Sequence, residues 1–158
     1  MGMIGYFSAV SREEAGQLAH GGLELEDLNP YERPSLDIDK SWQAIHFVLC
    51  GDIADGEPPL GYVVPMLDAQ AIEFGEFGAF YLLPGQVAEA AQALKGFTRE
   101  DFRARYDIDQ LASNQVYPVF TDEDSEEFFD YLATNLEAVS ELYKQAAELG
   151  QGIVFFVS

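Results

Sequence analysis

The sequence predicts an α+β fold, with one compact domain over residues 1–158 and a small mixed β-sheet packed with about five helices. Three observations lead to this prediction. Strand-like apolar segments stand at the N-terminus, near the middle and at the C-terminus. Helical patterns stand between them in runs, without a regular alternation of helix and strand. The chain has no repeat, low-complexity segment or break in composition, as is typical of a single domain of 158 residues.

The first elements are a strand and a short helix. Ile4–Val10 is apolar enough to form the N-terminal strand. Ser11 and Glu14 have the spacing of a capping box, which predicts a helix that ends at Gly21–Gly22. Residues 23–36 contain two prolines and an asparagine, and we expect a loop there.

A second, clearly amphipathic helix is predicted to begin near Asp37 or Asp39 and to end at Gly51. Its inward stripe repeats at helical spacing and consists of Trp42, Ile45 and Leu49. We therefore expect Trp42, the single tryptophan, to be largely buried. After a loop rich in glycine and proline, a strand is predicted at residues 62–64.

The second half begins with a strand at Phe77–Leu83 and a helix from Pro84 to about Leu94. Side-chain caps predict three further helix starts, at Thr98 with Asp101, at Asp107 or Asp109, and at Thr121 with Asp124. The last of these helices is long and ends at Gly150. Ile153–Val157 is expected to be the C-terminal strand.

The chain is strongly acidic. It has 28 Asp and Glu against 8 Lys and Arg, which gives a net charge of -20. Binding to phosphate backbones and anionic lipids depends on Lys and Arg that displace counterions, so this balance excludes nucleic acid and membrane surfaces as partners. It leaves a basic protein, a cation or no specific partner, and it leaves the oligomeric state open.

Residue counts and spacing exclude most familiar cofactor sites. Cys50 is the single cysteine, which excludes an intrachain disulfide and favours a reducing compartment. Because the start also lacks the basic region of a signal peptide, we expect a cytoplasmic protein. One Cys and two His are too few for a Cys/His zinc site, and the acidic runs 52–57 and 122–127 lack the ligand spacing of an EF-hand. We therefore expect no metal and no cofactor.

His46 and Cys50 stand four residues apart on the second predicted helix, where their side chains can meet. A Cys/His nucleophile pair has such an arrangement. Cys50, however, is expected at the C-terminus of the helix, where the negative end of the helix dipole disfavours a thiolate. We therefore favour packing roles for both side chains over catalysis.

A polar cluster is predicted around the start of the same helix. Its members are Asp37, Asp39, Lys40, Trp42, His46 and Tyr117. Lys40 stands in the first turn, where the helix dipole disfavours a cation, and Tyr117 is included because folding can bring it close. We favour local ion pairing and capping as the explanation. The alternative is a group of acid, base and cation that holds a small polar ligand.

The last helix is predicted to carry an acidic ridge. Its inward stripe consists of Phe128, Leu132, Leu136, Val139, Tyr143 and Ala146. On the other face carboxylates recur at spacings of four and seven, at Glu126, Asp130, Glu137, Glu141 and Glu148. Lys144 is the only cation expected nearby. We favour a solubilising role for this ridge, and the functional alternative is a docking surface that steers a basic partner.

Several segments resemble a known family. They are the start M-G-M-I-G-Y-F, the helix L-D-I-D-K-S-W-Q-A-I-H-F-V-L-C-G, the V-Y-P of Val116–Pro118 and the terminal strand. In order and spacing they are similar to the YfbM-like family of uncharacterised bacterial proteins, over nearly the whole chain. Cys50 departs from the Thr that is more frequent in the family. The resemblance implies one compact bacterial α+β domain over residues 1–158, and it supplies no activity, cofactor or catalytic residue.

Two hypotheses about function follow. The first is a non-catalytic cytoplasmic binding protein, such as an inhibitor, an antitoxin-like protein or an adaptor, whose acidic face docks a basic protein. The second is an enzyme or small-ligand-binding protein that uses the polar cluster. We favour the first, because the sequence has no catalytic signature.

Overall fold

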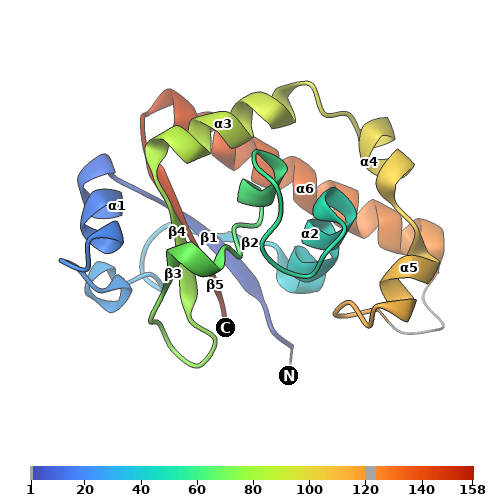
Figure 1. The fold of residues 1–158 in the computed structure, drawn as a ribbon, viewed down its shortest axis with the longest axis horizontal. Helices are drawn as coiled ribbons and strands as arrows, with labels where there is room; N and C mark the ends of the chain where they lie inside the picture. The colour runs from blue at the N-terminus through green and yellow to red at the C-terminus, as the bar shows by residue number, and fades with distance from the viewer. Residues whose placement is uncertain (1, 120–123) are drawn as a thin grey trace.

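The structure is organised around a five-stranded sheet with the strand order β2-β1-β5-β4-β3 (Figure 1). The computed structural model describes residues 2–119 and 124–158. The strands are β1 (Gly5–Val10), β2 (Leu36–Asp37), β3 (Ala71–Ile72), β4 (Ala79–Leu82) and β5 (Gly152–Val157). β5 pairs with β1 on one side and with β4 on the other, so the C-terminal strand joins the two parts of the sheet.

The α+β class is confirmed, but the expectation of a mixed sheet is wrong, because all strand pairings in the described residues are antiparallel. The connection between β4 and β5 explains the difference. α3 (Pro84–Lys95) leads away from β4, and α6 (Ser125–Glu148) returns beside it (Figure 1). The chain therefore re-enters the sheet at the end where it left, and β5 runs opposite to β4. A single crossover helix would instead have produced a parallel pair.

Six α-helices lie in the described part of the chain, together with four short 3-10 helices. The others are α1 (Arg12–Ala19), α2 (Trp42–Cys50), α4 (Arg99–Arg105), α5 (Ile108–Ser113), η1 (Leu25–Leu28), η2 (Asp39–Ser41), η3 (Leu60–Tyr62) and η4 (Asp68–Gln70). The predicted caps Ser11, Thr98 and Asp107 each accept a backbone hydrogen bond at a helix start. Asp124, predicted as the capping-box partner of Thr121, is itself the N-cap of α6. Thr121, also predicted there, lies outside the described residues. None of the described helices is long and apolar enough to cross a membrane.

Different parts of the chain cover the two faces of the sheet. On one face Phe7 and Phe155 pack in a core with α2, α3 and α6. The predicted inward stripe of α6 is buried throughout, as expected from its spacing. On the other face Val154 and Phe156 form a second cluster with α1 and residues 23–36. Because successive side chains of a strand point to opposite faces of the sheet, β5 contributes side chains to two separate cores.

Residues 51–67 fold over α2 and α6 without forming the strand predicted at residues 62–64, so that prediction is wrong. The hydroxyl of Tyr143, which is fully buried, lies 2.7 Å from the carbonyl oxygen of Tyr62 and 2.9 Å from that of Val63. A side chain of α6 therefore occupies the backbone acceptors that a strand would have needed.

The same loop encloses His46, whose side chain is completely buried. Among residues 2–119 and 124–158, neither ring nitrogen has a partner in hydrogen-bonding geometry. Burial lowers the pKa of His46. The nearby backbone of Ala54, Val64 and Asp55 raises it, but by less than burial lowers it. The imidazole is therefore neutral in the folded protein at neutral pH.

The Tyr143 hydroxyl gives a first prediction about stability. Tyr143→Phe should lower the free energy of unfolding by about 1 to 3 kcal/mol, because it leaves buried carbonyl oxygens of residues 62 and 63 without their donor. Urea unfolding measures the change. The matched control is Tyr31→Phe, which removes an exposed hydroxyl and should change stability by less than about 0.5 kcal/mol. Equal effects of the two substitutions would contradict this account.

The burial of His46 gives a prediction about pH. Histidine in the unfolded chain has a pKa of about 6.5, and the folded-state pKa is lower. As the pH falls below about 6.5 toward the folded-state pKa, the unfolded chain takes up a proton that the folded protein does not, so stability is lost. The decline in the free energy of unfolding between about pH 7.5 and pH 5.5 should be smaller in His46→Leu than in the wild type. A His20→Leu control, at the exposed histidine, should keep the wild-type decline, and equal declines in all three proteins would contradict the prediction.

Candidate functional site

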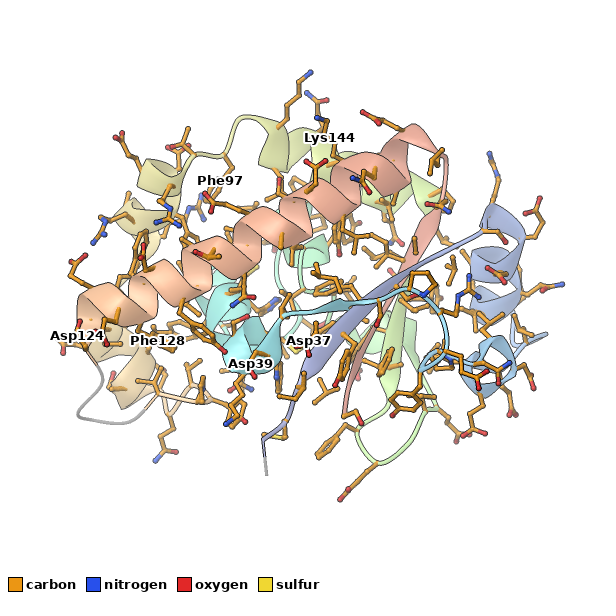
Figure 2. All side chains as sticks on the ribbon, turned by 180° about the vertical axis from the view of Figure 1, so that it is seen from behind. Asp37, Asp39, Phe97, Asp124, Phe128 and Lys144 are labelled. Carbon is orange, nitrogen blue, oxygen red and sulfur yellow. The ribbon has the colours of Figure 1, made fainter. Side chains whose placement is uncertain are left out.

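Asp37 ends β2 and Asp39 begins η2, so both predicted carboxylates lie beside α6 and ahead of α2 (Figure 2). α2 begins at Trp42, later than the predicted start near Asp37 or Asp39. Asp39 donates its backbone N–H to the Asp37 Oδ1 atom at 2.7 Å. Its own backbone has φ 54°, in the left-handed region that side-chain-bearing residues seldom adopt, although Asp tolerates it. Both residues are exposed. Asp37 does not cap the helix as we favoured, since the N-cap residues are Ile38 for η2 and Ser41 for α2 and neither makes a side-chain cap.

Tyr131 of α6 joins this cluster, and sequence reasoning missed it. Its hydroxyl donates to the Asp39 Oδ2 atom at 2.7 Å and accepts the backbone N–H of Lys40 at 2.9 Å. Burial, followed by the hydrogen bond to Asp39, raises the pKa of the Tyr131 hydroxyl. It therefore stays protonated and acts as a fixed donor toward the carboxylate. The available signal was its position three residues after Phe128, at the border of the inward stripe.

Lys40 does not form the local ion pair that we favoured. It takes part in none of the salt bridges found in residues 2–119 and 124–158. Its aliphatic stem instead packs over Gly2, where any added side chain would collide with it. The Lys40 ammonium group, although close to Asp37 and Asp39 in sequence, forms an ion pair with neither of them.

Trp42 and Tyr117 come together, as the inclusion of Tyr117 in the cluster anticipated. Their ring centroids lie 5.8 Å apart. The Trp42 Nε1–H donates to the carbonyl oxygen of Met3, and the Met3 N–H donates to the Tyr117 hydroxyl, both at 2.9 Å. Gln43 accepts the Tyr117 backbone N–H at 2.7 Å. Trp42 is 7% exposed, as predicted, and these two rings hold the N-terminal segment in place.

His46 does not join the polar cluster. It belongs to the same helix as Trp42 but is enclosed by residues 51–67. Cys50, which stands one turn further along, is half-buried, and burial raises the pKa of its thiol to about 11. A thiol with that pKa is protonated at neutral pH and is a poor nucleophile. The packing roles that we favoured for both residues agree with this environment.

The acidic ridge on α6 is partly neutralised from within the chain. Arg99 contacts Asp130 at 2.6 Å and Glu137 at 3.3 Å, while Arg103 binds both carboxylate oxygens of Glu126 at 3.0 and 2.9 Å. The expectation that Lys144 is the only nearby cation is therefore wrong. α4 lies against α6, and a contact between two helices cannot be predicted from the residue spacing within one of them.

At the other end of the ridge, no cation forms an ion pair within the described residues. Glu141 accepts a hydrogen bond from the Gln145 amide at 3.2 Å, and neither Glu141 nor Glu148 joins an ion pair within the described residues. Lys144 lies on the same end of α6, far from Asp124 (Figure 2). In the described parts of the chain, no group of three or more His, Cys, Asp or Glu side chains is arranged to hold a metal ion.

Comparisons with known proteins agree with the resemblance. The sequence matches the family described as Domain of unknown function (DUF1877) over residues 1–156. Protein YfbM of Escherichia coli (strain K12) is 29% identical over 160 residues, which cover 95% of each chain. The crystal structure of YfbM from Escherichia coli, a protein of unknown function, has the same fold, with a TM-score of 0.77 at 24% identity over 98% of this chain and 99% of that chain. The chain therefore belongs to the DUF1877 family.

Proposed function

We propose that the protein is a non-catalytic cytoplasmic binding protein, such as an inhibitor, an antitoxin-like protein or an adaptor, that docks a basic protein. The observation that carries this proposal is the uncompensated charge of its surface. The net charge is -20, and only four carboxylates of the described residues form ion pairs. Such a field accelerates association with a basic partner and repels nucleic acid.

The environments of the two most reactive side-chain types support a non-catalytic role. His46 is buried and Cys50 has a raised pKa, so neither is suited to proton transfer or nucleophilic attack at neutral pH. Cys50 is also the only cysteine, which suits a reducing cytoplasm.

The open end of the acidic ridge is the face that we assign to docking. Glu126, Asp130 and Glu137 already bind arginines of α4, so a partner would have to compete for them. Glu141 and Glu148 have no such competitor in the described structure. Reversing these two charges therefore tests the ridge without breaking a contact that stabilises α4.

We expect affinity capture from a bacterial cytoplasm to retain basic proteins at about 50 mM salt and to release them at about 500 mM, since screening weakens exposed charge contacts. The double variant Glu141→Lys with Glu148→Lys should lose this capture while keeping the wild-type melting temperature. A control with the same change of charge elsewhere is Glu57→Lys with Glu89→Lys, at exposed positions, and it should retain most of the capture.

Two results would count against the proposal. If the ridge variant captures the same proteins as the wild type at low salt, the ridge is not the docking face. If the wild type captures no protein in a salt-dependent way, binding to a basic partner is the wrong function.

A second candidate function is binding of a small polar ligand, or catalysis, at the polar cluster. The observation that favours it is the left-handed backbone of Asp39, because strained conformations cluster at functional sites. The Asp37 and Asp39 carboxylates and the unpaired Lys40 would contact such a ligand. Asp37, Asp39 and Lys40 line neither of the two hollows on the sheet face that α1 covers.

Lys40→Ala distinguishes this candidate from a structural cluster. Because Lys40 makes no ion pair in the described residues, we expect the free energy of unfolding to change by less than about 0.5 kcal/mol. A ligand of the cluster should raise the melting temperature of the wild type and of an exposed-lysine control, Lys95→Ala, but not that of Lys40→Ala. Equal shifts in all three proteins would remove the cluster as a site.

A further inference from the structure

We propose that the protein reads an arginine-bearing segment of its basic partner in a groove on the sheet face that α1 covers. This inference rests on the proposed function and adds to the acidic ridge a second surface, with its own partner chemistry. The groove consists of two hollows with volumes of about 400 Å³ and about 640 Å³. Glu26, Phe74 and Gly75 line both hollows, which makes them continuous. We call this surface the glutamate groove.

Aromatic rings form the floor of the groove. Tyr31 is 65% exposed, whereas Phe74 beneath it is 7% exposed. The ring centroid of Tyr31 lies 5.7 Å from that of Phe74 and 5.5 Å from that of Phe156, and the Tyr31 hydroxyl donates to the Ser158 Oγ atom at 3.0 Å. These contacts orient the Tyr31 ring while leaving most of it open to solvent. An open aromatic face of this kind attracts a cation, and a planar guanidinium can stack on it.

Carboxylates form the rim, and the chain does not neutralise them. The lining glutamates are all exposed, and they are Glu24, Glu26, Glu32, Glu73 and Glu76. None of them forms an ion pair within the described residues, and no Lys or Arg is among the lining residues. Arg33 follows Glu32 directly, but both of its terminal nitrogens bind the Glu14 carboxylate at 3.1 Å. The negative charge of the groove is therefore complementary to a cation of a binding partner.

The chain itself shows which cation suits this combination of ring and carboxylate. The Arg103 guanidinium carbon lies 3.9 Å from the centroid of the Phe129 ring while the same group binds both oxygens of Glu126. The groove offers the equivalent groups at Tyr31 and Glu26 without an arginine. Arginine fits both at once because its fork binds a carboxylate in two places and its plane covers a ring.

The length of the groove favours a protein segment over a small cation. Carboxylates stand in both hollows, at Glu32 in one and at Glu73 and Glu76 in the other, with Glu26 shared between them. An extended segment with more than one basic side chain can reach both hollows at once. Its second contact benefits from the high effective concentration that the first contact creates.

The experiment measures binding of a fluorescently labelled short peptide of alternating glycine and arginine at low salt. Tyr31→Leu should weaken binding about fivefold, because it removes the ring face but keeps an apolar side chain. Tyr31→Phe keeps the ring and should bind as the wild type does. Glu26→Gln with Glu32→Gln should also weaken binding about fivefold. Melting temperatures should be unchanged, since the Tyr31, Glu26 and Glu32 side chains are exposed.

The control with matched charge is Glu141→Gln with Glu148→Gln, which should bind the arginine peptide as the wild type does. The inference is overturned if this control loses as much affinity as the groove variant, if Tyr31→Leu and Tyr31→Phe bind equally, or if the corresponding lysine peptide binds as tightly. It is also overturned if the wild type does not bind the arginine peptide. Salt-dependent capture of a basic protein that depends on Glu141 and Glu148 would still support the proposed function in each case.

Discussion

The sheet is continuous only because β5 lies in its centre. β1 pairs with β5 along its whole length, and the β3–β4 hairpin reaches the rest of the sheet only through β5. Successive residues of this strand also serve opposite cores, since Phe155 packs toward α2 and α6 while Phe156 packs toward residues 23–36. The pairing joins segments from the two ends of the chain, so its loop-closure entropy must be offset by apolar burial on both faces. The continuity of the sheet therefore depends on a pairing between the two ends of the chain.

Sequence reasoning predicted what is decided locally and missed what is decided at a distance. The caps Ser11, Thr98 and Asp107 and the inward stripe of α6 depend on residues a few positions apart, and the structure contains them all. Strand direction depends on the return of α6 beside α3, which no short pattern records. At the polar cluster, the missing member was Tyr131, 92 residues from Asp39. His46 was included in the cluster from its place on the helix, and its enclosure by residues 51–67 depends on a fold-back that no helical spacing records.

The scarce cations of the chain join its elements. Arg33 links residues 23–36 to α1 through Glu14, Arg99 and Arg103 link α4 to α6, and the Arg105 guanidinium donates to the Leu49 carbonyl oxygen at the end of α2 at 2.9 Å. Each of these cations serves an internal contact, and four carboxylates are thereby neutralised. The carboxylates of the glutamate groove and of the open end of the acidic ridge form no ion pair within the described residues. The carboxylates that bind arginines therefore stabilise the fold, whereas those without an ion pair are available to contact a partner.

Trp42 has a consequence for how the two candidate surfaces can be told apart. Its indole bonds to Met3 and contacts the rings of Tyr117 and Phe155, so a single fluorophore stands where the N-terminal segment, α2 and β5 meet. Trp42 itself belongs to the polar cluster, and Lys40 stands two residues before it. The glutamate groove lies on the other face of the sheet, where Tyr31 and Phe74 pack with Phe156. We therefore expect the emission of Trp42 to change when a ligand binds the polar cluster and to stay unchanged when a partner binds the glutamate groove. A single fluorescence spectrum would distinguish the two binding events without a label.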